Sequence, residues 1–271
     1  LVLNSRGLTK QFVKAAAGLV QQLAENHQVV LVEGSNSLES GDGKKLAEAL
    51  GAKVLAVVTH RQGMDLSDLS EWKTSHMDSF LGVIFNSRRQ YLGTEVNQVL
   101  LPALAMEQIR SFGVIPESRT LLAVTVGQIA KHLEARFLTE ENDLNALVEY
   151  FMVGGWVLDE GRLYFETHDN KAVLMKGNRP DIQMAALSTP TKAMICTGGL
   201  EPIEYVFYEA QETGAALMVV STDTVSTMES LNTIQGQARF DNQVKVQRFV
   251  ELLENYVDIE GLLVLLDIQG N

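Results

Sequence analysis

The sequence predicts an α/β protein in which an incomplete, doubly wound and mostly parallel sheet is followed by a smaller α/β domain. Short runs rich in valine, leucine and isoleucine alternate with amphipathic segments of helical length, as in parallel sheets that are covered on both faces. A polar stretch at residues 139–143 interrupts this alternation, and the composition shifts after it. We therefore expect two domains, residues 1–139 and residues 140–271.

The first domain should contain four buried strands and the helices between them. The predicted strands are residues 29–32, 54–58, 81–86 and 112–116. The predicted helices are residues 9–26, 42–50, 65–76, 94–110 and 125–133, with Thr9 as the N-cap of the first and Pro102 as a kink in the fourth. Because continuous apolar strands are buried on both faces, this order favours a parallel sheet.

Two glycine turns mark the second domain. We expect strands at residues 152–158, 163–166, 173–175, 193–196 and 217–220, and helices at 202–212 and 242–256. The turn Gly177-Asn178-Arg179 follows one strand and the turn Thr197-Gly198-Gly199 follows the next, and each leads into a helix. Both turns should therefore lie at the carboxyl edge of the sheet, where open α/β sheets bind ligands. A cation, a hydroxyl and free backbone N–H groups there predict an anion-binding concavity.

Composition excludes several functional classes. The net charge of −12 argues against nucleic acid or an anionic membrane as a partner. No apolar run approaches the roughly 18 residues that a membrane helix needs, and no secretory signal opens the sequence, so we expect a cytoplasmic protein. Cys196 is the single cysteine and is expected to be buried; the five histidines show no metal-ligand spacing. No nucleophile and base are marked out as a pair.

Motifs in both halves resemble known families. In the first half, residues 29–34, 47–55, 82–86 and 113–117 resemble, in this order, the dethiobiotin-synthetase-like branch of P-loop proteins. The second half resembles the DRTGG domain, with Asn178-Arg179 at the Asp-Arg turn and Thr197-Gly198-Gly199 at the Thr-Gly-Gly turn. The two in this order resemble the N-terminal region of long-form phosphate acetyltransferases and its stand-alone relatives.

The sequence departs from these families in one important respect. The phosphate loop Gly-x-x-x-x-Gly-Lys-Ser/Thr is missing, since residues 40–45 have the wrong spacing and no serine or threonine after the lysine. The resemblance implies that the sequence starts after the family's first strand and loop, and that it lacks the acetyltransferase catalytic domain. We therefore expect no catalytic residue in this chain, and a nucleotide with Mg²⁺ only if a phosphate loop lies upstream.

The resemblance implies two groups of site residues. The expected ligand-binding residues are Asn178, Arg179, Asp181, Thr197, Gly198, Gly199, Asp223 and Thr224. Glu33 and Gly34, after the first predicted strand, and Asn86, at the end of the third, are weaker nucleotide-binding candidates. Arg179 is the central candidate, with Asp181 and Asp223 as its expected internal partners. The family's aspartate is replaced by Asn178, which leaves Arg179 freer for an external anion.

These observations predict a non-catalytic, homo-oligomeric regulatory module that senses a small anionic metabolite or nucleotide. Three alternatives stay open. The chain could belong to an ATP-dependent ligase or ATPase like dethiobiotin synthetase, with its phosphate loop upstream. It could be an excised part of a phosphate acetyltransferase, which transfers acetyl between coenzyme A and phosphate. It could also be a purely structural oligomerisation unit.

Overall fold

The structure is a computed structural model that describes residues 9–34, 40–155 and 161–268. The chain forms two compact units: unit 1 comprises Leu1–Glu117 and Glu251–Asn271, and unit 2 comprises Ser118–Val250. The division falls ahead of the expected boundary after residue 139 because Val124, Val126 and Ile129 are buried in the core of unit 2. The mixed α/β class with a parallel sheet and a separate second domain is confirmed.

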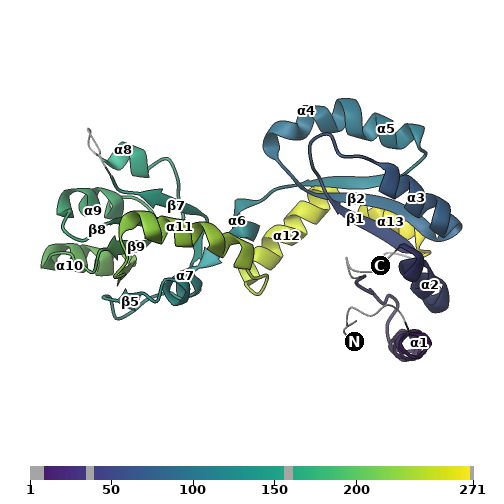
Figure 1. The fold of residues 1–271 in the computed structure, drawn as a ribbon, viewed down its shortest axis with the longest axis horizontal. Helices are drawn as coiled ribbons and strands as arrows, with labels where there is room; N and C mark the ends of the chain where they lie inside the picture. Colours follow the sequence, from purple (N-terminus) through teal and green to yellow (C-terminus); the bar gives the residue numbers. More distant parts are fainter. Residues whose placement is uncertain (1–8, 35–39, 156–160, 269–271) are drawn as a thin grey trace. The chain divides into compact units, whose positions relative to one another are not determined.

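Unit 1 is built on a three-stranded parallel sheet in the order β1–β2–β3. The strands are β1 (Val54–Thr59), β2 (Phe80–Arg88) and β3 (Ser111–Pro116). One face packs against α3 (Ser67–His76) and a helical stretch made of α4 (Gly93–Glu95), η3 (Val96–Leu100) and α5 (Leu101–Met106) (Figure 1). Phe85 of β2 and Leu104 of α5 are fully buried in this core.

Shorter elements complete unit 1. They are α1 (Lys10–Ala24), α2 (Ser40–Leu50), η1 (Met77–Ser79), η2 (Gln90–Leu92) and α13 (Ile259–Leu265). The Thr9 hydroxyl accepts a hydrogen bond from the Phe12 amide at 3.2 Å, which confirms the predicted N-cap of α1. The helix expected at residues 42–50 begins two residues earlier, so Asp42 lies inside the first turn of α2.

The strand expected at residues 29–32 does not form. This segment has no regular structure, and Leu31 is 91% exposed. A strand persists only when a neighbour accepts and donates its backbone hydrogen bonds, and no described strand of unit 1 pairs with this segment. The described sheet of unit 1 therefore has three strands instead of the four expected.

Unit 2 contains a five-stranded sheet in the order β5–β10–β9–β8–β7, in which only β5 runs antiparallel. The strands are β5 (Arg136–Phe137), β7 (Tyr150–Val153), β8 (Lys171–Lys176), β9 (Thr191–Thr197) and β10 (Ala216–Val219). The strands β4 (Val124–Thr125) and β6 (Leu147–Val148) form a separate two-stranded antiparallel sheet. The strand, turn and helix pattern predicted around the glycine turns is confirmed.

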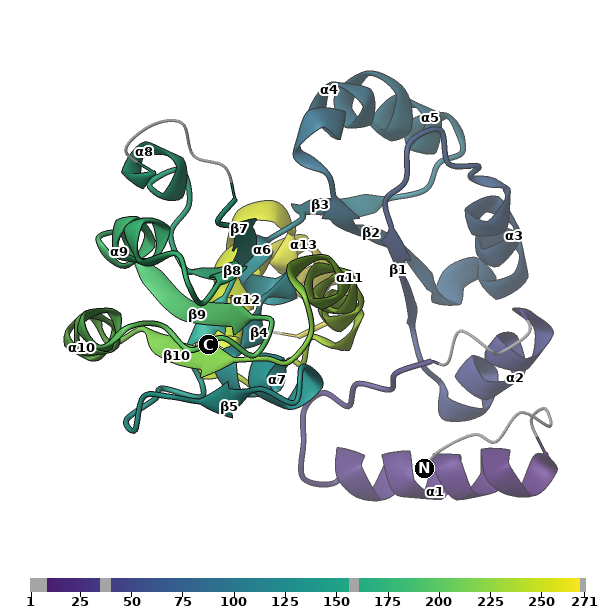
Figure 2. The same cartoon turned by 60° about the vertical axis from the view of Figure 1, so that its left-hand side comes forward.

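Helices cover both faces of the unit 2 sheet (Figure 2). On one face lie α7 (Val126–His132) and α11 (Thr224–Ile234); on the other lie α8 (Arg162–Phe165), α9 (Pro180–Leu187) and α10 (Glu204–Thr213). The remaining helices are α6 (Arg119–Leu122), η4 (Gln235–Gln237) and α12 (Gln243–Tyr256), whose last residues belong to unit 1. None of the helices described is long and apolar enough to cross a membrane.

Two strand predictions in unit 2 need correction. Residues 163–166, expected as a strand, lie mainly in the helical turn α8, in which Leu163 and Tyr164 are exposed and Phe165 is buried. One helical turn packed on α9 is enough to bury Phe165, so the segment does not need to pair with a strand. The strand expected at residues 152–158 ends at Val153, and residues 156–158, with Trp156, lie outside the described residues.

Candidate functional site

The candidate site lies where three neighbouring parallel strands end. In the sheet register, Lys176 of β8 is opposite Thr197 of β9, and Cys196 of β9 is opposite Val219 of β10. The loops after β8, β9 and β10 therefore begin side by side at one edge. The eight residues predicted to bind a ligand lie in these loops or in the strand ends and first helical turns that flank them, so the structure places them along one edge of the sheet.

The first two loops touch through their backbones. A Cβ atom added at Gly177 would overlap the carbonyl oxygen of Leu200, which follows the second turn. Only a residue without a side chain fits at this position, and it lets the loop after β9 lie directly on the loop after β8. Gly177 is therefore what allows the close approach of the two turns.

The second and third loops are joined by hydrogen bonds. Gly198 and Gly199 have φ angles of 77° and 69°, in the left-handed region that glycine adopts without strain. Their amides donate to the carbonyl oxygens of Thr222 and Val220, both at 2.8 Å. The expected free N–H groups at this turn are thus already used, because the left-handed turn directs them toward the loop after β10.

A pair of hydroxyls links β9 to α11. Thr197 is 1% exposed, and its Oγ1 lies 2.7 Å from Oγ1 of Thr224, the first residue of α11. The same hydroxyl lies 3.4 Å from the Met175 carbonyl oxygen on β8. This one buried hydroxyl of β9 therefore contacts groups from both neighbouring strand–helix units.

Arg179 forms an exposed, two-pronged ion pair with Asp181. Its Nε and Nη2 donate to the two carboxylate oxygens at 3.1 and 2.9 Å. This hydrogen bonding lowers the pKa of Asp181 and raises the pKa of Arg179. The two side chains are 44% and 64% exposed, so the pair contributes little to stability. Asn178 beside it is exposed.

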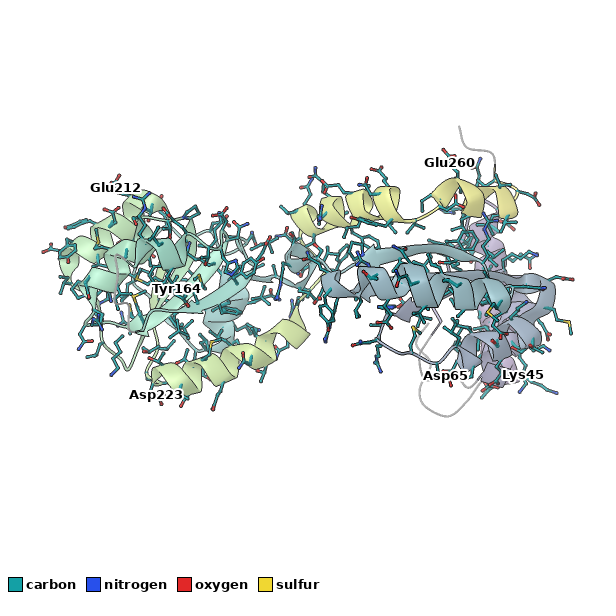
Figure 3. All side chains as sticks on the ribbon, turned by 90° about the horizontal axis from the view of Figure 1, so that it is seen from above. Lys45, Asp65, Tyr164, Glu212, Asp223 and Glu260 are labelled. Carbon is teal, nitrogen blue, oxygen red and sulfur yellow. The ribbon has the colours of Figure 1, made fainter. Side chains whose placement is uncertain are left out.

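Asp223, the other expected partner of Arg179, serves a different role. It lies where α11 begins (Figure 3) and accepts hydrogen bonds from the Val225 and Ser226 amides at 2.9 and 3.1 Å. Bonds from the Ser226 hydroxyl and amide are the main causes that lower the pKa of Asp223. An aspartate in this position satisfies amides that the first turn of a helix leaves unpaired. The expected ion pair with Arg179 is replaced by this cap.

Sequence reasoning missed the group that supports the first turn from inside. Gln183 of α9 is fully buried, and its Nε2 donates to the carbonyl oxygens of Lys176 and Gly177 at 3.1 and 3.0 Å. Its neighbour Cys196 is also buried, and this burial raises the pKa of the thiol to about 12. The signal in the sequence was a glutamine placed between the apolar residues Ile182 and Met184.

The weaker candidates lie in unit 1. Glu33 and Gly34 are exposed in the irregular segment, so they do not follow a strand as expected. Asn86 lies within β2, and its Oδ1 accepts from the Ser87 amide at 2.8 Å, next to the left-handed Ser87 with φ 58°. Within the described ranges, no cluster of three or more histidine, cysteine, aspartate or glutamate side chains could hold a metal ion.

Comparison with known proteins connects these loops to a family. Residues 128–234 match the family model described as the DRTGG domain, and this range includes both glycine turns and α11. In solved structures, the CBS and DRTGG domains of the regulatory region of Clostridium perfringens pyrophosphatase, complexed with the activator diadenosine tetraphosphate, match with 12% identity and a TM-score of 0.36. That match covers 53% of this chain and 70% of the other.

Curated relatives are phosphate acetyltransferases. The protein from Synechocystis sp. is 23% identical over 283 residues, which cover 96% of this chain and 40% of the relative. The proteins from Nitratidesulfovibrio vulgaris and Salmonella typhimurium are 26% and 24% identical, each match covering 55% of this chain and 22% of the relative. The chain therefore spans well under half the length of these relatives.

Proposed function

The chain carries a DRTGG domain at residues 128–234 and resembles the N-terminal region of phosphate acetyltransferases, and from this premise we propose that it is a non-catalytic regulatory module. In this proposal, a small anionic metabolite or nucleotide binds at the carboxyl edge of the unit 2 sheet. Arg179 is the main anion contact, with Asn178 and the turn at Thr197 beside it.

The observation that carries the proposal is the exposed ion pair between Arg179 and Asp181. A solvent-exposed pair is worth at most about 1 kcal/mol, so an incoming carboxylate or phosphate can replace Asp181 at little cost. The guanidinium would then offer the same two-pronged donors to the ligand. Because Asn178 is uncharged, no second carboxylate at the turn opposes an anion.

The bonds between the loops explain how binding could be transmitted. Leu200 lies against Gly177, and the amides of Gly198 and Gly199 are tied to the loop after β10. A ligand that moves the Arg179 turn would therefore change the packing of all three loops. Such a ligand shifts the population between two arrangements by its difference in affinity for them.

The test is ligand binding by the whole chain, measured by isothermal titration calorimetry with ATP, AMP and inorganic phosphate. We expect at least one of them to bind, and Arg179→Gln to weaken that binding about tenfold. The control is Arg162→Gln, which removes another exposed arginine–carboxylate pair in unit 2, with Glu166, and should leave affinity unchanged. Absence of binding by all three compounds, or equal loss in both variants, would contradict the proposal.

We also propose that the module is a cytoplasmic homo-oligomer, assembled through unit 2. Exposed aromatic side chains on α10 support this part, since Tyr205 and Tyr208 are 51% and 56% exposed. Light scattering should give a mass of at least about twice the 29.8 kDa of one chain. A monomer at micromolar concentration would count against it. When the module is part of a phosphate acetyltransferase, the regulated reaction would be acetyl transfer between coenzyme A and phosphate.

A further inference from the structure

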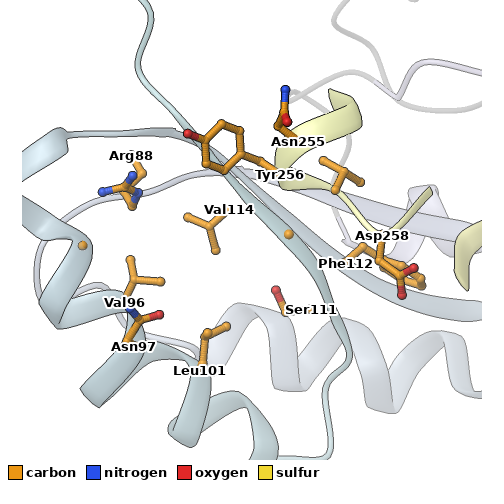
Figure 4. Close-up of a pocket in the computed structure, with 13 residues that line it drawn as sticks. Arg88, Val96, Asn97, Leu101, Ser111, Phe112, Val114, Asn255, Tyr256 and Asp258 are labelled. Atoms are coloured by element: carbon orange, nitrogen blue, oxygen red, sulfur yellow. The ribbon is translucent and has the colours of Figure 1, made fainter. Parts of the chain in front are cut away.

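Unit 1 contains a cavity of about 610 Å³ that the proposed function does not use (Figure 4). It lies beside β3, between the helical stretch that includes η3 and the joint between α12 and α13. This volume lies within the range of small-molecule sites, roughly 300–1,000 Å³. All of its lining residues belong to unit 1.

The walls of the cavity are fixed by backbone contacts. The Asp258 amide donates to the Phe112 carbonyl oxygen at 2.7 Å, and Val257 forms a β-bridge with Gly113. The Asp258 carboxylate also accepts a hydrogen bond from Arg110 Nη2 at 3.0 Å, so its negative charge is paired with an arginine. A Cβ atom at Gly113 would overlap the Tyr256 carbonyl oxygen, so this glycine is what permits the joint to lie on β3. The cavity is therefore built before any ligand arrives.

One buried polar atom in the cavity has no partner. The Ser111 hydroxyl oxygen is inaccessible to solvent in the described structure, and it makes no hydrogen bond with any described residue. Figure 4 shows it pointing into the cavity. A buried hydroxyl without a partner destabilises the folded protein, so a ligand that binds while Ser111 rotates toward it gains by supplying the missing hydrogen bond.

A π-helical turn shapes the opposite wall. Within η3 the Leu101 amide bonds to the Val96 carbonyl oxygen, five residues back, next to Pro102, which has no amide hydrogen to donate. Val96 and Leu101 line the cavity with Val114 from β3 as an apolar wall. Asn97 also lines it, and its carboxamide makes no hydrogen bond to the part of the chain that the structure describes.

Arg88 supplies a cation at one end. Its Nη1 donates only to the Arg89 and Gln90 carbonyl oxygens, at 3.4 and 3.3 Å, and the described residues offer it no ion pair. These distances are long for a hydrogen bond, and a guanidinium has five donors, so most of its donor capacity is unused. The cavity thus has an apolar wall with the Arg88 guanidinium at one end and the neutral polar side chains of Asn97 and Ser111 nearby. This combination suits a ligand with an anionic group on an apolar body.

We propose that this cavity binds a small organic anion, a carboxylate or phosphate ester carried on an apolar body. The anionic group meets Arg88, and the apolar body lies on Val96, Leu101 and Val114. A polar substituent meets Asn97 and, once the Ser111 side chain rotates toward the ligand, its hydroxyl. This site is separate from the strand ends of unit 2, because every residue of it lies in unit 1.

The test uses benzoate and phenyl phosphate as probes, with benzyl alcohol as the uncharged match. Their binding to the whole chain is followed by NMR shifts of the Ser111 and Val114 amides. We expect at least one anion to bind and to shift these amides, and benzyl alcohol to bind about tenfold more weakly. Tighter binding of benzoate would indicate a carboxylate site, and tighter binding of phenyl phosphate would indicate a phosphate site.

Variants assign the contacts. Arg88→Gln should weaken binding of the anion about tenfold. The control is Arg89→Gln, which removes the neighbouring exposed arginine that bonds to Tyr91 and should leave binding unchanged. Ser111→Ala, which removes the hydroxyl and adds no atom, should weaken binding of the probe while keeping the fold. Arg179→Gln should not change binding of these probes, so this test can fail or succeed independently of the test of the unit 2 site. No shift at about 10 mM probe, or equal binding by wild type and Arg88→Gln, would overturn the proposal.

Discussion

The Cα atom of Gly177 lies against the carbonyl oxygen of Leu200, and no side chain fits between them. This contact joins the end of β8 to the loop that follows β9, two segments more than twenty residues apart in the sequence. The same loop is tied to the segment after β10 by the amides of Gly198 and Gly199. The three strand ends of the candidate site therefore behave as one packed unit.

Gly177→Ala should destabilise unit 2 by about 1–3 kcal/mol, because the new methyl group must push the loop after β9 away. Urea denaturation at neutral pH measures this change. The matched control is Gly155→Ala, where an added Cβ meets nothing within 4 Å, and its effect should stay within about 0.5 kcal/mol. Equal stability of the Gly177 variant and wild type would show that the two loops are not packed as described.

The hydroxyls of Thr197 and Thr224 should be energetically coupled. Thr197→Val leaves one hydroxyl without its 2.7 Å partner and should cost about 1 kcal/mol, as should Thr224→Val. The double variant should cost less than the sum, with a coupling of at least about 0.5 kcal/mol in denaturant unfolding. Thr213→Val is the control, since Thr213 bonds only within α10 and its effect should add to that of Thr197→Val. Simple additivity of Thr197 and Thr224 would contradict the bond.

The grouping of the site residues could be predicted because it depends on local patterns. A glycine turn after an apolar run marks the end of a strand, and parallel strands end at one edge, so Arg179 and Thr197 were expected together. How these groups are paired could not be predicted in the same way. Asp223 caps α11 instead of pairing with Arg179, because the position of the first turn of α11 brings the Val225 and Ser226 amides to its carboxylate.

The failures in the fold have a related cause. Residues 29–32 have the composition of a buried strand, yet a strand needs a partner, and pairing is a tertiary property. Residues 163–166 open with a short apolar and aromatic run that fits either a strand or one helical turn, and the packing of Phe165 selects the helical turn α8. The support from Gln183 was missed because a glutamine between apolar residues of a helix does not show which carbonyl groups it meets.

Cys196 should be nearly inert toward thiol reagents in the folded protein. Burial raises the pKa of its thiol from 9.0 to about 12, so the reactive thiolate is about a thousandfold rarer at pH 8 than in the unfolded chain. Labelling with Ellman's reagent at pH 8 should be slower by at least two orders of magnitude than in guanidinium chloride. Gly177→Ala, which loosens the loop beside it, should speed the labelling. Rapid labelling of the wild-type protein would mean that the thiol is accessible.

Lys171 should make stability depend on pH in the alkaline range. The lysine is fully buried at the start of β8, and its Nζ donates to the carbonyl oxygens of His168 and Pro190 at 3.1 and 2.9 Å. Burial lowers the pKa of this amine below its usual 10.5. Between the lowered pKa and 10.5 the unfolded chain binds more protons than the folded one, so the contribution of Lys171 to stability rises with pH across that window.

The measurement compares the free energy of unfolding of wild type and Lys171→Met at several pH values from neutral to about 10.5. Methionine keeps a similar volume but removes the donor to the His168 and Pro190 carbonyl oxygens, so the variant should be less stable throughout. The difference in favour of wild type should widen as pH rises, since the charged lysine is the form that burial penalises. Lys192→Met, at an exposed position on β9, is the matched control for loss of a lysine. A difference for Lys171 that stays constant or narrows with rising pH would contradict the predicted shift.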